Sequence, residues 1–179
     1  MTLTGQIIET IKLPDGVKAT LRGSAITIQA GKGKLSRVFL APRVQVKMGS
    51  GEVTFASEYP RKREKALVRT FAAHLRNMVA GVTEGHSYRM KIVFSHFPMK
   101  VTVKEQDVWI ENFLGERFPR KAPVVGQCKV EVKGDEVFVA GPDIEEVGQT
   151  AANIERATKV KGFDPRVFQD GIYIVQKGG

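Results

Sequence analysis

Two segments of the chain interleave aromatic rings with basic side chains, which are residue types that contact RNA. The first segment is Asn112–Pro123 and the second is Lys159–Tyr173. Their basic residues are, in chain order, Arg117, Arg120, Lys121, Lys159, Lys161 and Arg166. Cations pair with phosphates and rings stack on exposed bases, so basic loops with aromatic residues suit RNA. For the rings alone a structural role is favoured, in which Phe118, Phe163 and Phe168 pin long loops to a core.

Further basic residues extend this candidate set to the rest of the chain. Gly31–Lys34 resembles a phosphate-binding loop only superficially, because the P-loop pattern needs a strand before it and a helix after it. We interpret it as a hairpin tip whose glycines permit close approach to a phosphate backbone. The additional candidates for RNA contact are Lys32, Lys34, Arg37, Arg61, Lys62, Arg63 and Lys177.

No pattern of catalytic or metal-binding residues is present. The histidines, His74, His86 and His96, are expected on a helix, in a turn and at a strand end, without a second ligand at metal spacing. The single cysteine, Cys128, is expected in a strand as a small hydrophobic residue. Paired acids such as Glu145-Glu146 are expected to cap a helix rather than to transfer protons. The sequence therefore predicts no catalytic residue, no metal site, no cofactor and no enzyme activity.

Charge favours an anionic partner. The 179 residues carry a net charge of +9. Residues 1–82 hold 14 basic and 5 acidic side chains, whereas residues 83–179 hold 14 of each, so the whole excess lies in the first part. Such an excess points to nucleic acid, although it also serves solubility.

The expected compartment is a reducing cytoplasm. A single cysteine cannot form an internal disulfide, and no apolar run reaches the roughly 20 residues of a membrane span. The first residues, Met1–Thr4, lack a basic leader and an apolar core, so we expect no secretory signal and no membrane partner.

These candidate residues are positioned by two copies of one structural unit. Runs of alternating polarity begin at Val17 and at Met99, and at an offset of 82 Ile28 matches Ile110. Later identities pair Thr70, Ala72 and Arg76 with Thr150, Ala152 and Arg156. The repeat is too long for a solenoid unit. We therefore expect two duplicated domains, over residues 1–82 and 83–179.

Periodicity predicts the same elements in each copy. Residues 5–58 alternate with a period of two between glycine-rich turns, which indicates an antiparallel sheet. Apolar residues at helical spacing then predict a helix from near Pro60 to near Gly81, and a strand over 88–94 is expected to close the first copy.

The second copy follows the same plan. Strands are expected at 99–104, 107–112, 127–133, 136–140 and 171–175. Asp143 is expected to cap a helix over about 143–157, with Glu146 completing a capping box and Gly162 marking the tail that follows. The predicted class is α+β, with two similar domains that each pack one helix on a face of an antiparallel sheet.

The two aromatic and basic segments also carry a resemblance to a known family. Asn112–Pro123 and Arg166–Tyr173, with Val147–Ile154 at the final helix, resemble the archaeal and eukaryotic branch of the large-subunit ribosomal protein six family. That branch is called protein nine in older eukaryotic naming. The resemblance covers essentially the whole chain, and the two loops are its most specific part.

The resemblance implies a structural role in the large ribosomal subunit, in the cytoplasm. It implies binding to large-subunit rRNA near the sarcin–ricin loop, beside neighbouring large-subunit ribosomal proteins and close to where translational GTPases dock. In the family much of the rRNA contact comes from the second domain, partly through the loop before its last strand, here Lys159–Asp170. This loop lacks the bacterial Tyr-Lys-Gly-Lys-Gly run, so bacterial contacts are not transferred to it. The alternatives are a free-standing RNA-binding or RNA-chaperone protein and, with less support, a small hydrolase or nuclease.

Overall fold

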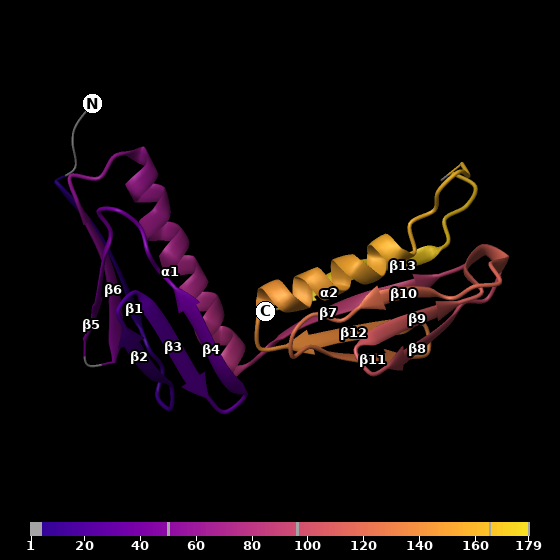
Figure 1. The fold of residues 1–179 in the computed structure, drawn as a ribbon, viewed down its shortest axis with the longest axis horizontal. Coiled ribbons are helices and arrows are strands. Elements are labelled where there is room, and N and C mark those ends of the chain that lie inside the picture. Colours follow the sequence, from indigo (N-terminus) through magenta and orange to yellow (C-terminus); the bar gives the residue numbers. More distant parts are fainter. Residues whose placement is uncertain (1–4, 50, 96, 165, 179) are drawn as a thin grey trace. The chain divides into compact units, whose positions relative to one another are not determined.

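The chain folds into two compact units, the first ending at Glu84 and the second beginning at Gly85 (Figure 1). The computed structural model describes residues 5–49, 51–95, 97–164 and 166–178. Predictions about Met1–Thr4, His96 and Pro165 lie outside the described residues. The boundary expected between residues 82 and 83 stays a prediction, and the first unit's helix continues through that position.

The first unit contains two three-stranded antiparallel sheets. Their strand orders are β1-β6-β5 and β2-β3-β4. The strands are β1 (Gln6–Lys12), β2 (Lys18–Arg22), β3 (Ala25–Ala30), β4 (Gly33–Val38), β5 (Gln45–Met48) and β6 (Glu52–Glu58). Gly31 and Lys32 alone separate β3 from β4, so this segment is the hairpin tip that the sequence predicts.

One helix, α1 (Lys62–Thr83), covers the first unit's core. It begins after Pro60, where the backbone N–H of Arg61 donates to the carboxylate of Glu64 over 2.9 Å. Its buried residues include Val68, Ala72 and Leu75, which form the stripe that packs inward. The predicted helix is thus present, displaced by about two residues toward the C-terminus.

Aromatic packing fills the space beneath α1. Phe39 and Phe55 are buried, and their rings contact Phe71 of the helix at centroid distances of 5.3 and 5.9 Å. Aliphatic residues of β3 and β6 complete this core. Such tilted and edge-on ring pairs are favoured over a face-to-face stack.

The second unit repeats this plan and adds one strand. Its sheets have the orders β10-β9-β8 and β11-β12-β7-β13, all antiparallel. The elements are β7 (His86–Val93), β8 (Lys100–Lys104), β9 (Asp107–Glu111), the short 3-10 turn η1 (Phe113–Gly115), β10 (Arg120–Pro123), β11 (Lys129–Lys133), β12 (Glu136–Gly141), α2 (Ile144–Ala157) and β13 (Gly171–Gly178). The predicted α+β class with duplicated domains is confirmed.

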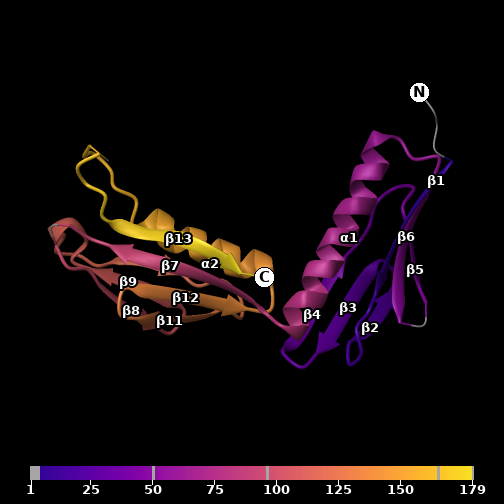
Figure 2. The same cartoon turned by 180° about the vertical axis from the view of Figure 1, so that it is seen from behind.

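The strand at His86–Val93 belongs to the second unit, so the prediction that it closes the first copy is wrong. It lies between β12 and β13 and pairs with both, as the view from behind shows (Figure 2). Its counterpart in the first unit is β1, which pairs with β6 in the same way. A strand with partners on both sides satisfies its backbone groups on both edges, and only the second unit supplies these partners. His86 consequently begins a strand and is buried, instead of lying in a turn.

One prediction about the start of α2 also needs correction. Asp143 caps the helix as expected, accepting from the backbone N–H of Glu145 over 2.8 Å. Glu146 does not complete a capping box, because its carboxylate accepts from the backbone N–H of Gln127 over 3.0 Å instead. The helix ends at Ala157, where the sequence predicts its end, and Gly162 lies in the following loop.

The buried residues of the first unit correspond to buried residues of the second unit. The buried pairs Ile26 and Ile28 of β3 correspond to Val108 and Ile110 of β9 at the offset of 82 that the sequence indicates. In the two helices, the alignment that the buried residues give is shifted by one residue from the alignment that the sequence identities give. Val68, Ala72 and Leu75 correspond to Val147, Ala151 and Ile154. Core position, rather than identity, therefore defines the equivalent helix residues.

Candidate nucleic-acid interface

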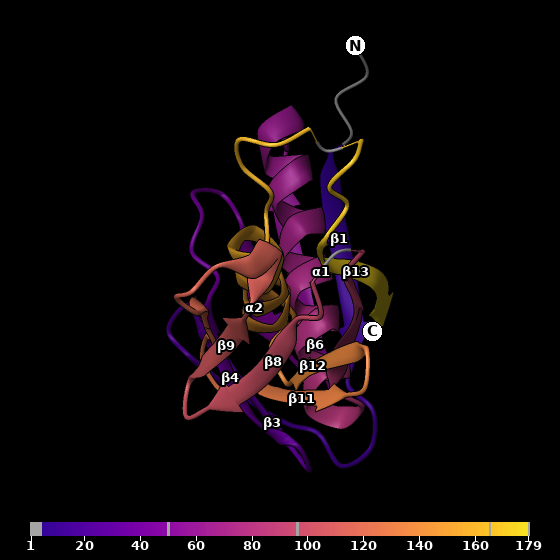
Figure 3. The ribbon, with the colours of Figure 1, turned by 90° about the vertical axis from the view of Figure 1, so that its right-hand side faces the viewer.

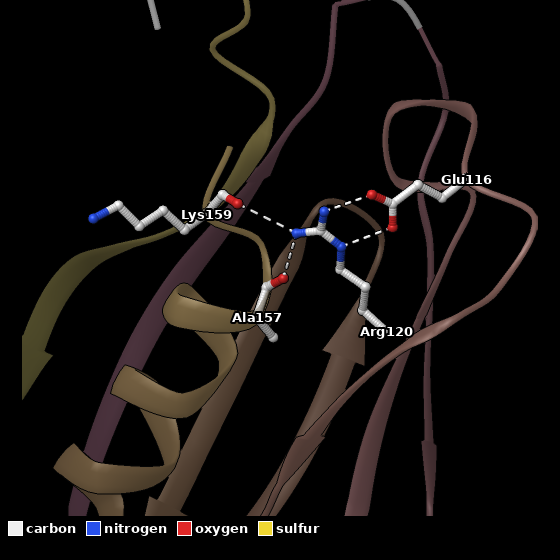
Figure 4. Close-up of polar contacts among 4 residues, drawn as sticks. All are labelled: Glu116, Arg120, Ala157 and Lys159. Atoms are coloured by element: carbon white, nitrogen blue, oxygen red, sulfur yellow. Dashed lines mark hydrogen bonds and ion pairs between the residues drawn. The ribbon is translucent and has the colours of Figure 1, made fainter. Parts of the chain in front are cut away.

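Arg120, at the start of β10, binds three parts of the second unit together (Figure 4). Its Nε and Nη2 donate to the two carboxylate oxygens of Glu116 over 2.8 and 2.6 Å. Its Nη1 donates to the carbonyl oxygens of Ala157 and Lys159 over 2.8 and 3.3 Å. The guanidinium carbon also lies 4.2 Å from the centre of the buried Phe113 ring.

These contacts give Arg120 a structural role, although the sequence predicts it as an RNA-contacting residue. The planar guanidinium matches a carboxylate bidentately, and its remaining donors satisfy carbonyls at the helix end that have no partner within the helix. A cation at this position also complements the negative end of the helix dipole. Arg120 therefore fixes the end of α2, and with it the start of the next loop, while RNA contact by Arg120 itself stays a prediction.

The loop from Lys159 to Asp170 is held at both of its arms. At the first arm the buried Thr158 hydroxyl accepts from the backbone N–H of Ile172 over 3.0 Å and donates to the carbonyl of Ile154 over 3.3 Å. At the second arm the buried carboxylate of Asp170 accepts from the backbone N–H of Ser95. Figure 3 shows the loop extending away from α2 as two arms.

Local contacts order the tip of this loop. Asp164 accepts from the backbone N–H of Arg166 over 2.9 Å through its side chain, and from that of Phe168 over 3.0 Å through its carbonyl. The rings of Phe163 and Phe168 pack with centroids 4.8 Å apart. The side chain of Arg166 is exposed. A loop with anchored arms and an ordered tip presents this guanidinium at a reduced entropic cost.

The outer face of the sheet β10-β9-β8 carries an aromatic and basic group that sequence reasoning missed. Trp109 has the Nζ of Lys121 at 4.0 Å and that of Lys104 at 5.0 Å from its ring centre. Cations over an indole face are favourably placed. Alternation in the run Asp107–Glu111 places Trp109 opposite to the buried Val108 and Ile110, and this is the signal that could have found it.

Residues from three elements line a hollow of about 330 Å³ beside Arg120. Its lining residues are Arg120, Lys121, Arg156, Ala157 and Lys161. The structure thus brings together three predicted residues and adds Arg156, which sequence reasoning treated only as a repeat identity. Lys159 faces a neighbouring hollow with Arg156, Phe168 and Tyr173.

The other predicted residues of the second unit lie apart from this hollow. Arg117 is exposed in the connection from η1 to β10, and Lys177 is exposed on β13. Phe118 is 84% exposed, so the expectation that it pins its loop to the core is wrong. The buried ring of that loop is Phe113, because the left-handed backbone at Asn112 and Leu114 turns the chain so that Phe113 points inward.

In the first unit, the predicted residue Lys32 also contacts the end of a helix. Its Nζ donates to the carbonyl of Glu84, and its backbone N–H donates to the carbonyl of Val82 over 3.1 Å. Lys34 is exposed on β4, and Arg37 is half-buried on the same strand. The hydrogen bonds of Lys32 tie the β3–β4 turn to the end of α1.

Arg61, Lys62 and Arg63 gather at the N-terminus of α1, and all three are exposed. The N-terminus is the positive end of the helix dipole, so cations there are locally unfavourable. Glu64 is the only acid of the first turn. Helix stability therefore does not explain this cluster, and RNA contact by these three residues stays a prediction.

The described residues offer little support for catalysis. They contain no group of three or more metal-ligating side chains. Burial raises the pKa of the Cys128 thiol, which keeps it protonated and weakly nucleophilic. No helix in the described part of the chain is long and apolar enough to cross a membrane.

Fold and surface together define a duplicated α+β binding protein with basic ends on both units. The chain is 50% identical over 177 residues to the large ribosomal subunit protein uL6 of Methanobrevibacter smithii, covering 99% of each protein. It is 49% identical over 172 residues to the protein of that name from Methanosarcina mazei, covering 96% of this chain and 98% of that protein. The uL6 protein of Methanococcus vannielii is 47% identical over 179 residues, covering 100% of this chain and 98% of that protein.

The family model for ribosomal protein L6 matches residues 13–85 and again residues 97–171, one match in each unit. The chain therefore belongs to the ribosomal protein L6 family. This confirms the family that the two loops suggest, and with it the prediction of a structural protein rather than an enzyme.

We predict that Arg120→Ala lowers the free energy of unfolding by about 2–3 kcal/mol, because it removes charge-assisted hydrogen bonds and leaves two carbonyls without a donor. Urea unfolding measures the change. Arg117→Ala, at an exposed neighbouring position, is the matched control and should stay within about 0.5 kcal/mol of the original chain. Equal effects of the two substitutions would contradict the structural role of Arg120.

The Glu116–Arg120 pair should also make stability depend on pH. Its hydrogen bond and charge hold the pKa of the Glu116 carboxyl below the ordinary value of 4.5. A depressed folded-state pKa contributes stability above the unfolded value, and this contribution is lost as the pH falls through the folded value. We therefore expect Glu116→Gln to lower Tm at pH 7 and to have a shrinking effect as the pH falls below 4.5. In the Arg120→Ala background the same substitution should have little effect at either pH.

Proposed function

We propose that this chain is a structural constituent of the large ribosomal subunit that binds large-subunit rRNA in the cytoplasm. Its near-full-length identity to proteins named large ribosomal subunit protein uL6 supports this assignment. Neighbouring large-subunit ribosomal proteins are the further partners. The finer proposal places the contact near the sarcin–ricin loop, close to the docking region of translational GTPases, as the family resemblance implies.

The observation that carries the rRNA-binding proposal is the Lys159–Asp170 loop. Both of its arms are fixed by buried hydrogen bonds of Thr158 and Asp170, and its tip exposes Arg166. Anchored loops with exposed cations lose little conformational entropy when they dock on a folded RNA. The loop before the last strand is also where the family resemblance locates rRNA contact.

The first unit supports a second contact through its charge. The exposed cations at the N-terminus of α1 lack a stabilising role there, and they contribute to the excess of basic residues in residues 1–82. A surface of this kind neutralises backbone phosphates without reading sequence. We therefore propose that both units contact rRNA, with specific placement coming from the second.

Sedimentation separates a ribosomal constituent from a free-standing RNA-binding protein. We expect the tagged chain, expressed in its own cells, to remain with large subunits after a high-salt wash, because an assembled constituent is held by many simultaneous contacts. Release into the supernatant by the wash would favour the free-standing alternative. A known loosely bound factor in the same gradients serves as the control.

Arg166→Ala should weaken incorporation into large subunits roughly threefold or more, as expected when one phosphate is no longer neutralised. Its Tm should hardly change, because Asp164 binds the backbone N–H of Arg166 rather than its side chain. Arg166→Lys, which keeps the charge, should retain more incorporation than Arg166→Ala. A large fall in Tm with normal incorporation would instead identify Arg166 as a structural residue.

A further inference from the structure

Trp109 is the only tryptophan of the chain, and it lies on the outer face of the sheet β10-β9-β8. Its direct neighbour across β10 is Lys121, and Lys104 approaches it from β8 on the other side. The two ammonium groups lie 4.0 and 5.0 Å from the centre of the same ring. This half-buried ring therefore has a cation beside it from each neighbouring strand.

The first unit shows that the fold does not need an aromatic ring at this position. At the offset of 82 that relates the two copies, Thr27 of β3 is equivalent to Trp109. The neighbour of Thr27 across β4 is Ser36, and the Thr27 hydroxyl donates to the Ser36 hydroxyl over 3.1 Å. Two small polar side chains therefore occupy the equivalent place on the equivalent sheet. The duplicated architecture does not impose Trp109 or Lys121.

The two lysines over the ring are not neutralised by the acids of the same face. Asp107 and Glu111 occupy the next outward positions of β9, and Asp107 lies directly opposite Lys104. In the described part of the chain, however, neither Lys104 nor Lys121 forms an ion pair with a carboxylate. Two like charges beside one ring repel each other, and this repulsion falls when the lysines separate onto two anionic groups.

We propose that Trp109 is a stacking platform for one unpaired base of RNA, and that Lys104 and Lys121 bind the phosphates on either side of that base. This inference rests on the proposed rRNA-binding function and names a subsite within it. On binding, the two flexible lysine side chains leave the ring and the base takes their place. A base stacked on an aromatic side chain is a stronger contact than an exposed cation beside it. Each lysine then gains a charge-assisted contact with a phosphate.

The combination of one ring with two cations favours a nucleotide over an acidic segment of a protein. A carboxylate needs only a cation, and it is matched best by a planar guanidinium, as Glu116 is by Arg120. A nucleotide uses the ring and both lysines, since it joins a flat base to phosphates on both sides. The base has to be unpaired, because bases within an RNA helix stack on one another and do not offer their faces to a side chain.

The competing explanation is that the Trp109–Lys121 pair only stabilises the sheet, as cross-strand pairs do. The two explanations predict different effects of Trp109→Thr, which introduces the residue type found at the equivalent position of the first unit. A purely structural pair lowers Tm and leaves RNA affinity unchanged. A stacking platform lowers RNA affinity, while the preference of threonine for strands limits the fall in Tm.

The first measurement is the fluorescence of Trp109 in the unsubstituted full chain. Because this residue is the only tryptophan, its emission reports on this site alone. We expect a large-subunit rRNA transcript to quench the emission in step with binding, since the stacked base contacts the indole directly. A fully paired RNA duplex should bind without comparable quenching. This measurement does not depend on how a variant folds.

The second measurement compares the rRNA affinities of Trp109→Thr and Phe138→Thr. Phe138 is the matched control, because it is also half-buried at an outward position and has the ammonium of Lys133 at 5.5 Å from its ring centre. Lys133, however, is paired with Glu131 over 2.9 Å. We expect Trp109→Thr to bind rRNA at least about fivefold more weakly than Phe138→Thr. The slope of log affinity against log salt should not change, because stacking neutralises no phosphate.

The two lysines should have a different signature in the same assay. For Lys104→Gln with Lys121→Gln, we expect the salt slope to become shallower by roughly 0.7 for each phosphate of a single strand that is no longer neutralised. Lys91→Gln with Lys129→Gln is the matched control, because it removes the same charge at exposed positions of β7 and β11, in the other sheet. This control should change the slope less.

Three outcomes overturn the proposal in distinguishable ways. Binding of rRNA without a change in Trp109 emission, or equal affinities of Trp109→Thr and Phe138→Thr, removes the stacking platform and leaves the proposed function standing. Quenching of Trp109 by polyglutamate, with rRNA affinity unchanged in Trp109→Thr, identifies an acidic protein as the partner. Failure of the unsubstituted chain to bind rRNA removes the proposed function as well as this subsite.

Discussion

The ends of both helices depend on one kind of interaction, a basic side chain that donates to carbonyls at or just beyond the last helical turn. In the first unit Lys32, from the turn between β3 and β4, donates to the carbonyl of Glu84. In the second unit Arg120, at the start of β10, donates to the carbonyls of Ala157 and Lys159. Since β4 and β10 are equivalent strands of the repeat, the duplication has kept both the position and the chemistry of this hydrogen bond to the helix end. It satisfies carbonyls that the helix leaves without partners.

This hydrogen-bonded contact differs between the two units in its strength and in the chain segment that follows the helix. A lysine ammonium makes a point contact, whereas the guanidinium of Arg120 also binds Glu116 bidentately and stacks on Phe113. After α1 the chain passes directly into the second unit at Gly85. After α2 it forms the Lys159–Asp170 loop and then adds β13 to the sheet. The stronger contact thus occurs where the chain continues from the helix into a long loop.

Much of the fold could be predicted from local pattern. Alternation with a period of two and a change to helical spacing located the strands and both helices, because one face of each element has to be buried. The errors concern partners that are distant in sequence. Nothing in the run His86–Val93 reveals that its neighbours are β12 and β13, and nothing local to Glu146 reveals that Gln127 lies within hydrogen-bonding distance. Phe113 is buried and Phe118 is exposed because the backbone is left-handed at Asn112 and Leu114. No residue type in this segment predicts that conformation.

The candidate site shows why counting charges does not locate a binding surface. Residues 83–179 have no net charge, yet the ammonium groups of Lys104 and Lys121 both lie over the Trp109 ring, and the acid Glu116 is bound to Arg120. Conversely, the strongly basic first unit uses Lys32 to hold a helix end. A cation is available to RNA only when no carbonyl or carboxylate of the protein already occupies its donors. That property depends on the folded partners of each side chain. It separates Arg120, whose donors are occupied, from Lys121, the next residue in the sequence, whose ammonium lies over the Trp109 ring on the outer face of the sheet.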